Sequence, residues 1–363
     1  MVPSRTALYN AHQAAGAKLV PFAGWDMPLQ YTSMLAEAKA TRASCGLFDV
    51  SHMGKAFLTG PQALNALLKL CTNDAARLAA GQAQYTLLCN EAGVALDDLI
   101  IYHIGEEAYL LVINASNTET DLAWMRRHLP EGANLRDDTE GLSLVAVQGP
   151  RSVEALRRVL PTPVADLPSF GVLGCEVAGA QGWIARTGYT GEDGFEVFCR
   201  SDRAPELWDQ LAGQPEVTLC GLGARDILRT EAGYPLYGHE LSADACPLEA
   251  GLGWVIRKGG GYIGDGPIEK VRAEGAMRRL RGLMLQDRGI ARPGFRVLSG
   301  DEEVGVVTSG TFSPNLQASI AMASLKVGAA KPGTSLTVEG DRRPLQATVV
   351  ALPFHRFPKF GPA

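Results

Sequence analysis

The sequence predicts an α+β protein whose C-terminal quarter is a small all-β unit, and three observations predict this class. Residues 55–141 mix strand-like and helix-like patterns, a second set of strands and helices begins at residue 142, and beyond residue 275 short apolar runs continue without helices. Strands with helices beside them are typical of α+β domains, whereas short strands at such spacing indicate a barrel or sandwich. At about 150 residues per domain, the 363 residues suggest two or three domains.

The composition indicates a chain that can bury a sizeable core. Hydrophobic residues make up 46% and charged residues 20%, and the mean hydropathy is zero, which excludes a disordered, collagen-like or coiled-coil chain. No apolar run approaches the roughly 18 residues that span a bilayer, so no membrane association is expected. The net charge is −5 without a basic cluster, so nucleic acid is not an expected partner.

The cysteines and histidines predict no metal site. The seven cysteines are scattered and include no C-x-x-C pair, and they are interpreted as small core residues in a reducing compartment. The histidines form neither an H-E-x-x-H motif nor an i, i+4 pair. The first 16 residues lack the apolar segment of a secretory signal, which makes the cytoplasm the expected location.

The first 54 residues are expected to form a loop, a helix and a strand. Residues 20–28 mix aromatic residues with Pro and Gly, which predicts an ordered loop rather than a helix. Residues 33–44 place apolar side chains on one helical stripe, and Cys45-Gly46 ends that helix. Residues 46–50 follow as a strand.

The later elements form two further blocks and the all-β unit. In the first block, strands are expected over 55–58, 84–89, 95–103 and 108–114, and helices over 61–70 and 118–128. In the second, strands are expected over 142–148, 175–177, 182–186 and 195–199, and helices over 151–159, 204–211 and 224–232. A charged helix over 269–274 precedes six short strands. The predicted domain segments are therefore 1–54, 55–141, 142–275 and 276–363.

Two adjacent acids, Asp97 and Asp98, lie in an otherwise apolar strand. Because strand side chains alternate, the two carboxylates face opposite sides of the sheet, and at least one faces a core or cavity. An unpaired buried carboxylate is costly, so the protein either pairs it or uses it. A strand-end turn with two solvated acids is the alternative.

Two segments that contain glycines, residues 188–196 and 221–229, could also carry chemistry. Residues 188–196 hold three glycines and three acids and end with Glu196 between apolar neighbours, which fits either a ligand loop or a simple hairpin. Arg225 lies in the unfavourable first turn of a helix, so either a carboxylate partner or solvent is expected to compensate it.

Two other motifs favour no site of their own. Residues 259–264 match G-x-G-x-x-G, but Asp265-Gly266-Pro267 follows instead of an immediate helix and no βαβ unit surrounds them, so no nucleotide is expected. His52 has Ser51 and Asp49 nearby, but local spacing does not make a triad, so a structural role is expected.

Together these pieces resemble the aminomethyltransferase family, the T-proteins of the glycine cleavage system, over essentially the whole chain. The motifs that carry the resemblance, in chain order, are Phe22-Ala23-Gly24-Trp25 with Gln30-Tyr31, residues 46–53 (GLFDVSHM), residues 90–93 (NEAG) leading into 96–99 (LDDL), Gln148-Gly149-Pro150, residues 188–194 (GYTGEDG), Ala224-Arg225-Asp226 and Leu236-Tyr237-Gly238. Any one match would be weak, whereas seven in the right order are specific.

The resemblance implies a three-domain cloverleaf: an antiparallel-sheet folate-binding core, an inserted ferredoxin-like α+β module and a C-terminal antiparallel β-barrel. It implies transfer of a methylene from an aminomethyl group, carried on the lipoyl arm of H-protein, to tetrahydrofolate, giving 5,10-methylenetetrahydrofolate and ammonia. It also implies transient binding of H-protein and a functional link to glycine decarboxylase and dihydrolipoyl dehydrogenase.

By motif, the resemblance implies that Asp98 is the catalytic carboxylate, orienting the reacting folate nitrogens and stabilising a developing cation. The pterin-pocket positions that it implies are Met53, Tyr85, Asn114, Tyr189 and Glu196. Arg225 and Tyr237 match positions near the benzoyl-glutamate tail, where a guanidinium can bind carboxylates. The C-terminal segment aligns loosely, and Arg356 or Lys359 is a further candidate for the tail or the lipoyl entrance.

Two alternatives keep the folate site. A folate-dependent demethylase would use another donor. The related dimethylglycine and sarcosine oxidising enzymes carry a large flavin domain, whereas the three segments expected here already account for the 363 residues. A non-enzymatic folate-binding accessory protein would use a Cys in the glycine-rich loop, and residues 188–191 (GYTG) contain none.

Overall fold

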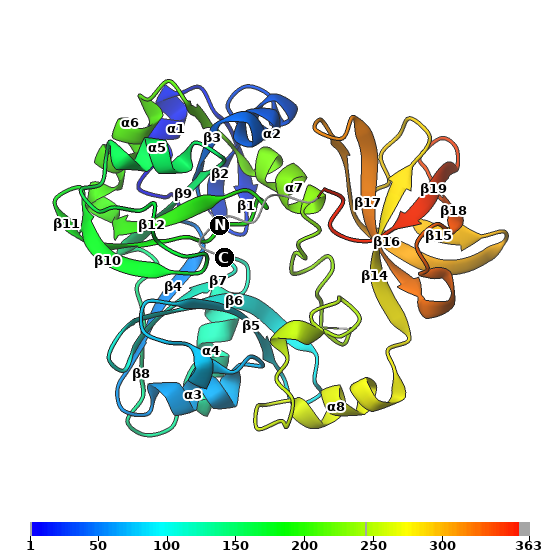
Figure 1. The fold of residues 1–363 in the computed structure, drawn as a ribbon, viewed down its shortest axis with the longest axis horizontal. Coiled ribbons are helices and arrows are strands. Elements are labelled where there is room, and N and C mark those ends of the chain that lie inside the picture. The colour runs from blue at the N-terminus through cyan, green and yellow to red at the C-terminus, as the bar shows by residue number, and fades with distance from the viewer. Residues whose placement is uncertain (1, 244, 356–363) are drawn as a thin grey trace.

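Three sheet-based units surround the middle of the molecule. The computed structural model describes residues 2–243 and 245–355, which form a six-stranded sheet, a five-stranded sheet, a closed barrel and a small two-stranded sheet. Figure 1 shows the two large sheets stacked on one side and the barrel on the other, with irregular chain between them. The predicted α+β class with a C-terminal β-barrel is confirmed.

The six-stranded sheet joins segments that are far apart in the sequence. Its order is β10-β11-β12-β9-β3-β13, and only the β13–β3 pairing is parallel. The strands are β3 (Cys45–Asp49), β9 (Leu142–Gln148), β10 (Val172–Val177), β11 (Ala180–Ala185), β12 (Gly194–Arg200) and β13 (Val217–Leu219). Every residue of β3 and β9 is buried, as expected for central strands covered on both faces.

Helices cover one face of this sheet, while a second layer covers the other. The helices α1 (Tyr9–Ala14), α5 (Ser152–Arg157) and α6 (Ala204–Ala212) lie beside the first face in Figure 1. Trp208 of α6 fills the core there. On the opposite face, α2 (Met34–Ala43) and α7 (Leu222–Glu231) share a core with Phe48 and with residues of the five-stranded sheet.

The five-stranded sheet is the predicted inserted module. Its antiparallel order is β5-β6-β7-β4-β8, with β4 (Gly54–Thr59), β5 (Ala83–Cys89), β6 (Ala95–Gly105), β7 (Ala108–Ile113) and β8 (Asn134–Asp137). The helices α3 (Ala63–Leu70) and α4 (Thr118–His128) pack on one face through a dense apolar cluster. Phe57 and Tyr102 on the other face pack toward the six-stranded sheet.

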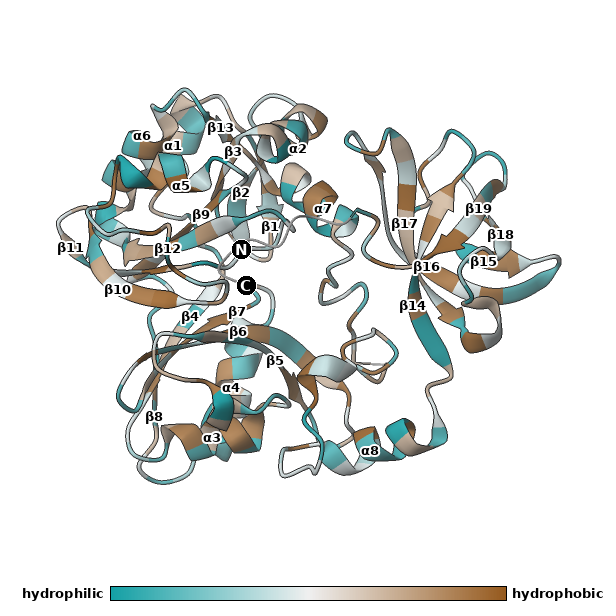
Figure 2. Cartoon of the chain, viewed as in Figure 1, coloured by the Kyte–Doolittle hydropathy of each residue, from teal (hydrophilic) through white to brown (hydrophobic). Residues whose placement is uncertain are grey.

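The C-terminal unit is a closed six-stranded barrel, as predicted. Its strands are β14 (Arg278–Leu285), β15 (Arg296–Ser299), β16 (Glu302–Ser313), β17 (Ala318–Lys326), β18 (Ser335–Val338) and β19 (Leu345–Val350), in the order β14-β17-β16-β15-β18-β19. Figure 2 shows apolar and polar residues alternating along these strands, because one face lines the barrel interior. α8 (Asp265–Glu274) leads into it. The proposed domain segments stay a prediction, which the sheet memberships support.

The structure corrects three local expectations. Residues 20–28 are not a loop but part of a hairpin of β1 (Lys18–Phe22) and β2 (Trp25–Gln30), because Ala23 and Gly24 adopt φ of 49° and 82° and make a tight turn. The short strands β8 and β13 were not predicted. α8 begins directly after Gly264, in spite of Pro267, because Pro is tolerated in a first helical turn.

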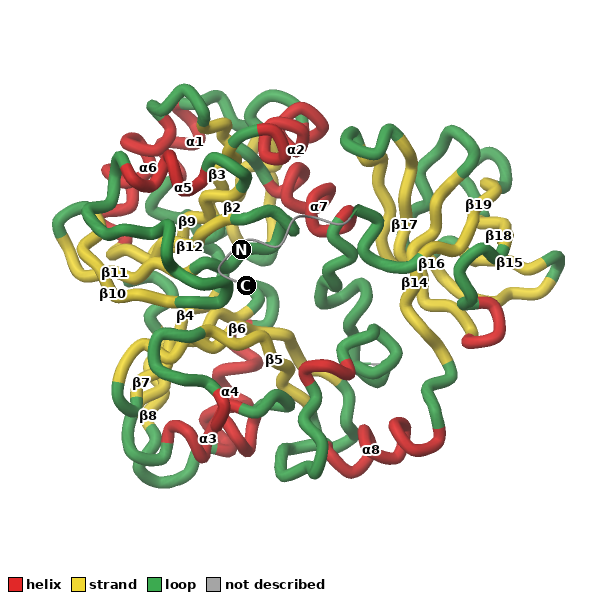
Figure 3. The backbone as a smooth tube through the Cα atoms, viewed as in Figure 1, coloured by secondary structure: helices red, strands yellow, loops and turns green. Residues whose placement is uncertain are grey.

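Long irregular chain joins α7 to α8, and Figure 3 shows it as mostly loop in the middle of the molecule. Two buried polar contacts fasten this region and α7 to the barrel. Arg229 donates to Glu240 at 2.9 Å and to Ser309 of β16 at 2.8 Å. Glu231 accepts from Asn315 of the barrel at 3.0 Å and pairs with Arg42 of α2 at 2.8 Å. The barrel is therefore held by charged hydrogen bonds rather than by apolar packing alone.

We predict that Arg229→Met destabilises the protein by about 3 kcal/mol or more, because Glu240 would remain buried without its cation. The matched control is Arg200→Met, whose Arg200–Asp202 pair is exposed to solvent and should contribute little to stability. Denaturant unfolding of both variants measures the difference. Equal losses of stability in the two variants would contradict a stabilising role of the buried Arg229–Glu240 pair.

Candidate functional site

Asp97 is fully buried in β6 and faces the helices of the module. It accepts hydrogen bonds from the backbone N–H of Asn114 at 3.1 Å, from the Asn114 side chain at 2.9 Å and from Asn117 at 2.8 Å. The alternative of two solvated acids at a strand end is therefore wrong. The buried carboxylate is paired through amide donors at the end of β7 and the start of α4.

Asp98 is half-buried and faces the opposite side, toward the six-stranded sheet. Tyr85 of β5 donates to its carboxylate at 2.9 Å, and the Asn114 side chain donates at 3.0 Å. Burial, followed by the charge of Asp97, raises the pKa of Asp98 to about 7, while the two donors oppose that rise. The group can therefore be either an acid or a carboxylate near neutral pH, which suits proton exchange and charge stabilisation.

The glycine-rich segment forms a second wall. It joins β11 to β12, so the hairpin interpretation describes its topology. Glu196 of β12 is buried and accepts from Tyr102 of β6 at 3.1 Å, so this acid links the two large sheets. The segment is fixed by Arg186, which forms an ion pair with Asp193 at 2.7 Å.

Arg225 is half-buried and forms no ion pair with a carboxylate among the described residues. Its guanidinium lies 4.9 Å from the ring centre of Tyr189, a cation–π contact. Its Nη1 has no hydrogen-bond partner among the described residues, and no ion pair of Arg225 is found among them. Desolvation lowers its pKa, although Glu196, Tyr189 and Tyr102 favour the charged form. The Nη1 group of Arg225 is thus an unpaired hydrogen-bond donor in a partly desolvated environment, where a ligand could supply the acceptor.

His52, for which the sequence predicts a structural role, is buried close to the site. Its Nδ1 is buried without a partner among the described residues, and its ring meets Phe22 edge-on at 5.6 Å. Burial, against the opposing charge of Asp49 and with the help of the charges of Arg225 and Lys55, lowers the pKa of His52 to about 3. This histidine is therefore neutral. Nothing in its local sequence distinguishes it from a structural histidine.

Lys55 fixes the turn that carries His52 and Met53. Its buried amine donates to the carbonyl oxygen of Met53 at 2.8 Å and to that of Ser51. Desolvation lowers the pKa of Lys55 to about 8. Met53 packs against the core between the two large sheets, so its position depends on these contacts.

The chain between α7 and α8 supplies Tyr237 and Trp254. Tyr237 packs in the same cluster as Tyr85, and its hydroxyl donates to the carbonyl oxygen of Ala95 at 3.4 Å. Trp254 stacks on Tyr85 with ring centres 5.9 Å apart and is 68% exposed. Trp254 could not be identified from the sequence, because a single Trp in irregular chain belongs to no motif.

The structure thus gathers most of the predicted residues at the junction of the two sheets and the α7–α8 connection. Asp98, Tyr85 and Asn114 are in direct contact, and Tyr189 and Arg225 are in contact. Arg356 and Lys359 lie outside the described residues. Over residues 2–243 and 245–355, no group of three His, Cys, Asp or Glu side chains could hold a metal. No helix in the same ranges is long and apolar enough to cross a membrane.

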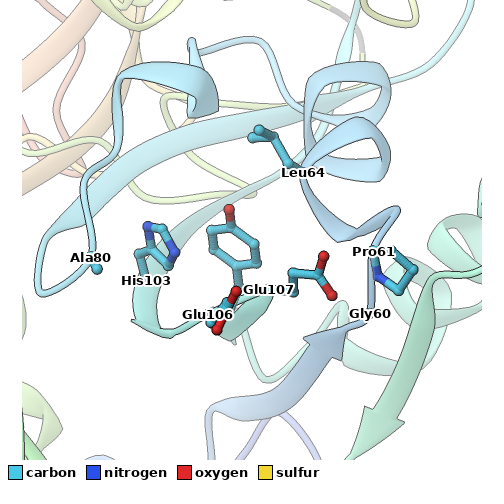
Figure 4. Close-up of a pocket in the computed structure, with 8 residues that line it drawn as sticks. Gly60, Pro61, Leu64, Ala80, His103, Glu106 and Glu107 are labelled. Atoms are coloured by element: carbon cyan, nitrogen blue, oxygen red, sulfur yellow. The ribbon is translucent and has the colours of Figure 1, made fainter.

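A separate hollow lies on the outer end of the module, around His103, Glu106 and Glu107 (Figure 4). Its volume is about 490 Å³. None of the predicted site residues lines it, and His103 is occupied by a hydrogen bond with the carbonyl oxygen of Leu78. The hollow is therefore distinct from the candidate site.

Comparison with known proteins gives matches over nearly the whole chain. Residues 8–259 match the family model of the GCVT N-terminal domain, and residues 278–355 match that of the glycine cleavage T-protein C-terminal barrel domain. An aminomethyltransferase of Geobacillus kaustophilus is 45% identical over 97% of this chain and 98% of its own length. An aminomethyltransferase of Symbiobacterium thermophilum is 44% identical over 98% of both chains.

A solved structure agrees with these matches. The crystal structure of glycine cleavage system aminomethyltransferase T from Bartonella henselae superposes with a TM-score of 0.93 at 34% identity. The superposition covers 98% of this chain and 99% of that one. The similarity therefore extends to the arrangement of all the domains.

We predict that Asp98→Asn stabilises the folded protein increasingly as the pH rises. Below about pH 4 Asp98 is protonated in both the unfolded and the folded state, so it contributes no difference. Between about pH 4 and the folded pKa of about 7, only the unfolded state loses the proton, so wild-type stability falls.

Asn does not titrate and escapes this loss. The stability gain of the variant over wild type should be at least about 1 kcal/mol larger at neutral pH than at acid pH. Urea unfolding across this pH range measures it, and a gain that is independent of pH would contradict the raised pKa.

Proposed function

The chain belongs to the aminomethyltransferase family of the glycine cleavage system, and we propose from this premise that it transfers a one-carbon unit to tetrahydrofolate. The donor is an aminomethyl group on the lipoyl arm of H-protein, and the products are 5,10-methylenetetrahydrofolate and ammonia. Tetrahydrofolate supplies the nucleophilic nitrogens when bound. The observation that carries the proposal is Asp98, an acid with a pKa near 7 held between two hydrogen-bond donors.

Asp98 is the proposed catalytic carboxylate. As a carboxylate it accepts hydrogen bonds from the reacting nitrogens and stabilises positive charge that develops beside it. Its pKa lets it also hold a proton at neutral pH, which a normal Asp would release. Tyr85 and Asn114 fix the carboxylate plane, so little reorganisation is needed during the reaction.

Other side chains fit the two chemical parts of a folate. The pterin ring is flat and edged with amide-like groups, and the proposed pocket offers the rings of Tyr85 and Tyr189, the apolar Met53 and the acceptor Glu196. The tail carries carboxylates, which suit the unused Nη1 donor of Arg225. The orphaned buried donor of Arg225 is the feature that fits a bound ligand most directly.

The proposed partner is lipoylated H-protein, bound transiently, with a functional link to glycine decarboxylase and dihydrolipoyl dehydrogenase. A donor carried on a long arm needs an open route to Asp98. Trp254, largely exposed beside Tyr85, lies at the solvent side of the site and supports such a route. Tyr237 holds the α7–α8 connection against Ala95 and keeps this side in place.

We predict that Asp98→Asn lowers folate-dependent turnover about 10²- to 10³-fold, because it removes the charge beside the reacting nitrogens while keeping the shape. The assay follows 5,10-methylenetetrahydrofolate and ammonia formed from aminomethyl-loaded H-protein. Affinity for tetrahydrofolate, measured by calorimetry, should change less than about tenfold.

The control is Asp301→Asn, which removes one exposed charge in the barrel and should leave turnover unchanged. Near-normal turnover of Asp98→Asn would refute its catalytic role. If wild type binds the folate but is inactive with this donor, the transfer reaction itself would be rejected.

A further inference from the structure

A second buried carboxyl group lies behind Asp97. Asp121 is in the first turn of α4 and has no exposed surface. Neither of its oxygens accepts a hydrogen bond from any N–H or O–H group of the described residues. An ionised carboxylate in such a place would lack both water and donors, which is a costly arrangement.

The partner of Asp121 is Asp97 itself. The two carboxyl groups lie within hydrogen-bond reach of each other. Two carboxylates cannot hydrogen-bond unless one of them carries a proton, and two like charges at this separation repel strongly. Asp97 already accepts three N–H donors from Asn114 and Asn117, so the negative charge is best placed on Asp97 and the proton on Asp121.

Asn114 connects this pair to Asp98. Its side-chain amide donates to Asp97 at 2.9 Å and to Asp98 at 3.0 Å. Because both acids demand a donor, the NH₂ group must face them, and the amide cannot rotate. Any change of charge on Asp97 therefore reaches Asp98 in two ways, through the shared amide and through direct repulsion.

We propose that Asp121 is a positioning residue for the transfer reaction: its carboxyl holds one proton in a hydrogen bond to Asp97 and so fixes the pair at a single negative charge behind Asn114 and Asp98. The proposal rests on the proposed function for its role in turnover. It assigns Asp121 no contact with the substrate. Its effect is to keep Asn114 oriented and to set the proton affinity of Asp98 through one fixed charge.

The electrostatic surroundings support this assignment. Burial and the charges of Asp97 and Asp98 raise the pKa of Asp121 to about 10. The groups that face the pair are Asp98 of β6, with Tyr85 behind it on β5, and the amides of Asn114 and Asn117. The N-terminus of α4 favours one negative charge nearby, which the shared-proton state retains.

Two variants locate the charge through the pH dependence of turnover. The acidic limb of the pH–turnover profile reports the ionisation of Asp98. In Asp121→Asn the amide NH₂ still donates to Asp97, so the midpoint of this limb should stay within about 0.3 pH unit of the wild-type midpoint. In Asp97→Asn the single charge is lost, and the same limb should move down by about one pH unit or more. Glu119→Gln, an exposed change on the same helix, is the matched control.

The opposite result, a downward shift in Asp121→Asn, would place the charge on Asp121 and overturn the proposal. Shifts in both variants would mean that both acids are ionised, and they would overturn it equally. A purely structural role of Asp121 would change stability and the size of kcat, but the position of the acidic limb would not differ between Asp121→Asn and Asp97→Asn.

Infrared spectroscopy tests the shared proton without any turnover. At a pH well above the Asp98 pKa of about 7, the wild-type protein should still show the carbonyl band of a protonated carboxylic acid, and Asp121→Asn should lose it. Absence of that band in wild type would overturn the proposal even if turnover is normal. If the band is present and the transfer reaction is absent, the proposed function fails while the shared proton stands.

Discussion

The burial of two adjacent acids on β6 is the constraint on which the rest of the site depends. Neither Asp97 nor Asp98 could be held there without donors, and the donors come from three other places in the chain: Tyr85 on β5, Asn114 after β7 and Asn117 before α4. The same burial gives Asp98 a pKa near 7. The desolvation that makes the buried carboxylate costly thus also gives it a pKa at which it can hold or release a proton near neutral pH.

The three units have distinct parts in creating that environment. The module carries the acids, and the six-stranded sheet covers the exposed face of β6 through Glu196 and its hydrogen bond with Tyr102. Among the described residues, none of the named site residues comes from the barrel. It instead holds α7 in place through Arg229 and Glu231, and α7 carries Arg225. A change in the barrel interface would therefore shift α7 and Arg225 without touching the site residues themselves.

Local sequence rules predicted the parts of the fold whose cause is local. The strand Leu142–Gln148 and the helix Thr118–His128 were predicted with the bounds that the structure has, because apolar periodicity alone sets them. Strand alternation likewise predicted that Asp97 and Asp98 face opposite sides. The hairpin at Ala23-Gly24 was missed because it depends on a left-handed turn at Ala23, which sequence does not favour. Asp121 and Trp254 could not be predicted, since their roles arise from contacts made across the fold.

The most direct test of the account is a crystal structure of the protein with tetrahydrofolate bound. We expect the reacting ring nitrogens to lie within hydrogen-bond distance of the Asp98 carboxylate, with Asn114 and Tyr85 still hydrogen-bonded to it and the folate against Tyr189. A folate bound elsewhere, such as in the hollow around His103, or bound with its reacting nitrogens turned away from Asp98, would contradict the central claim.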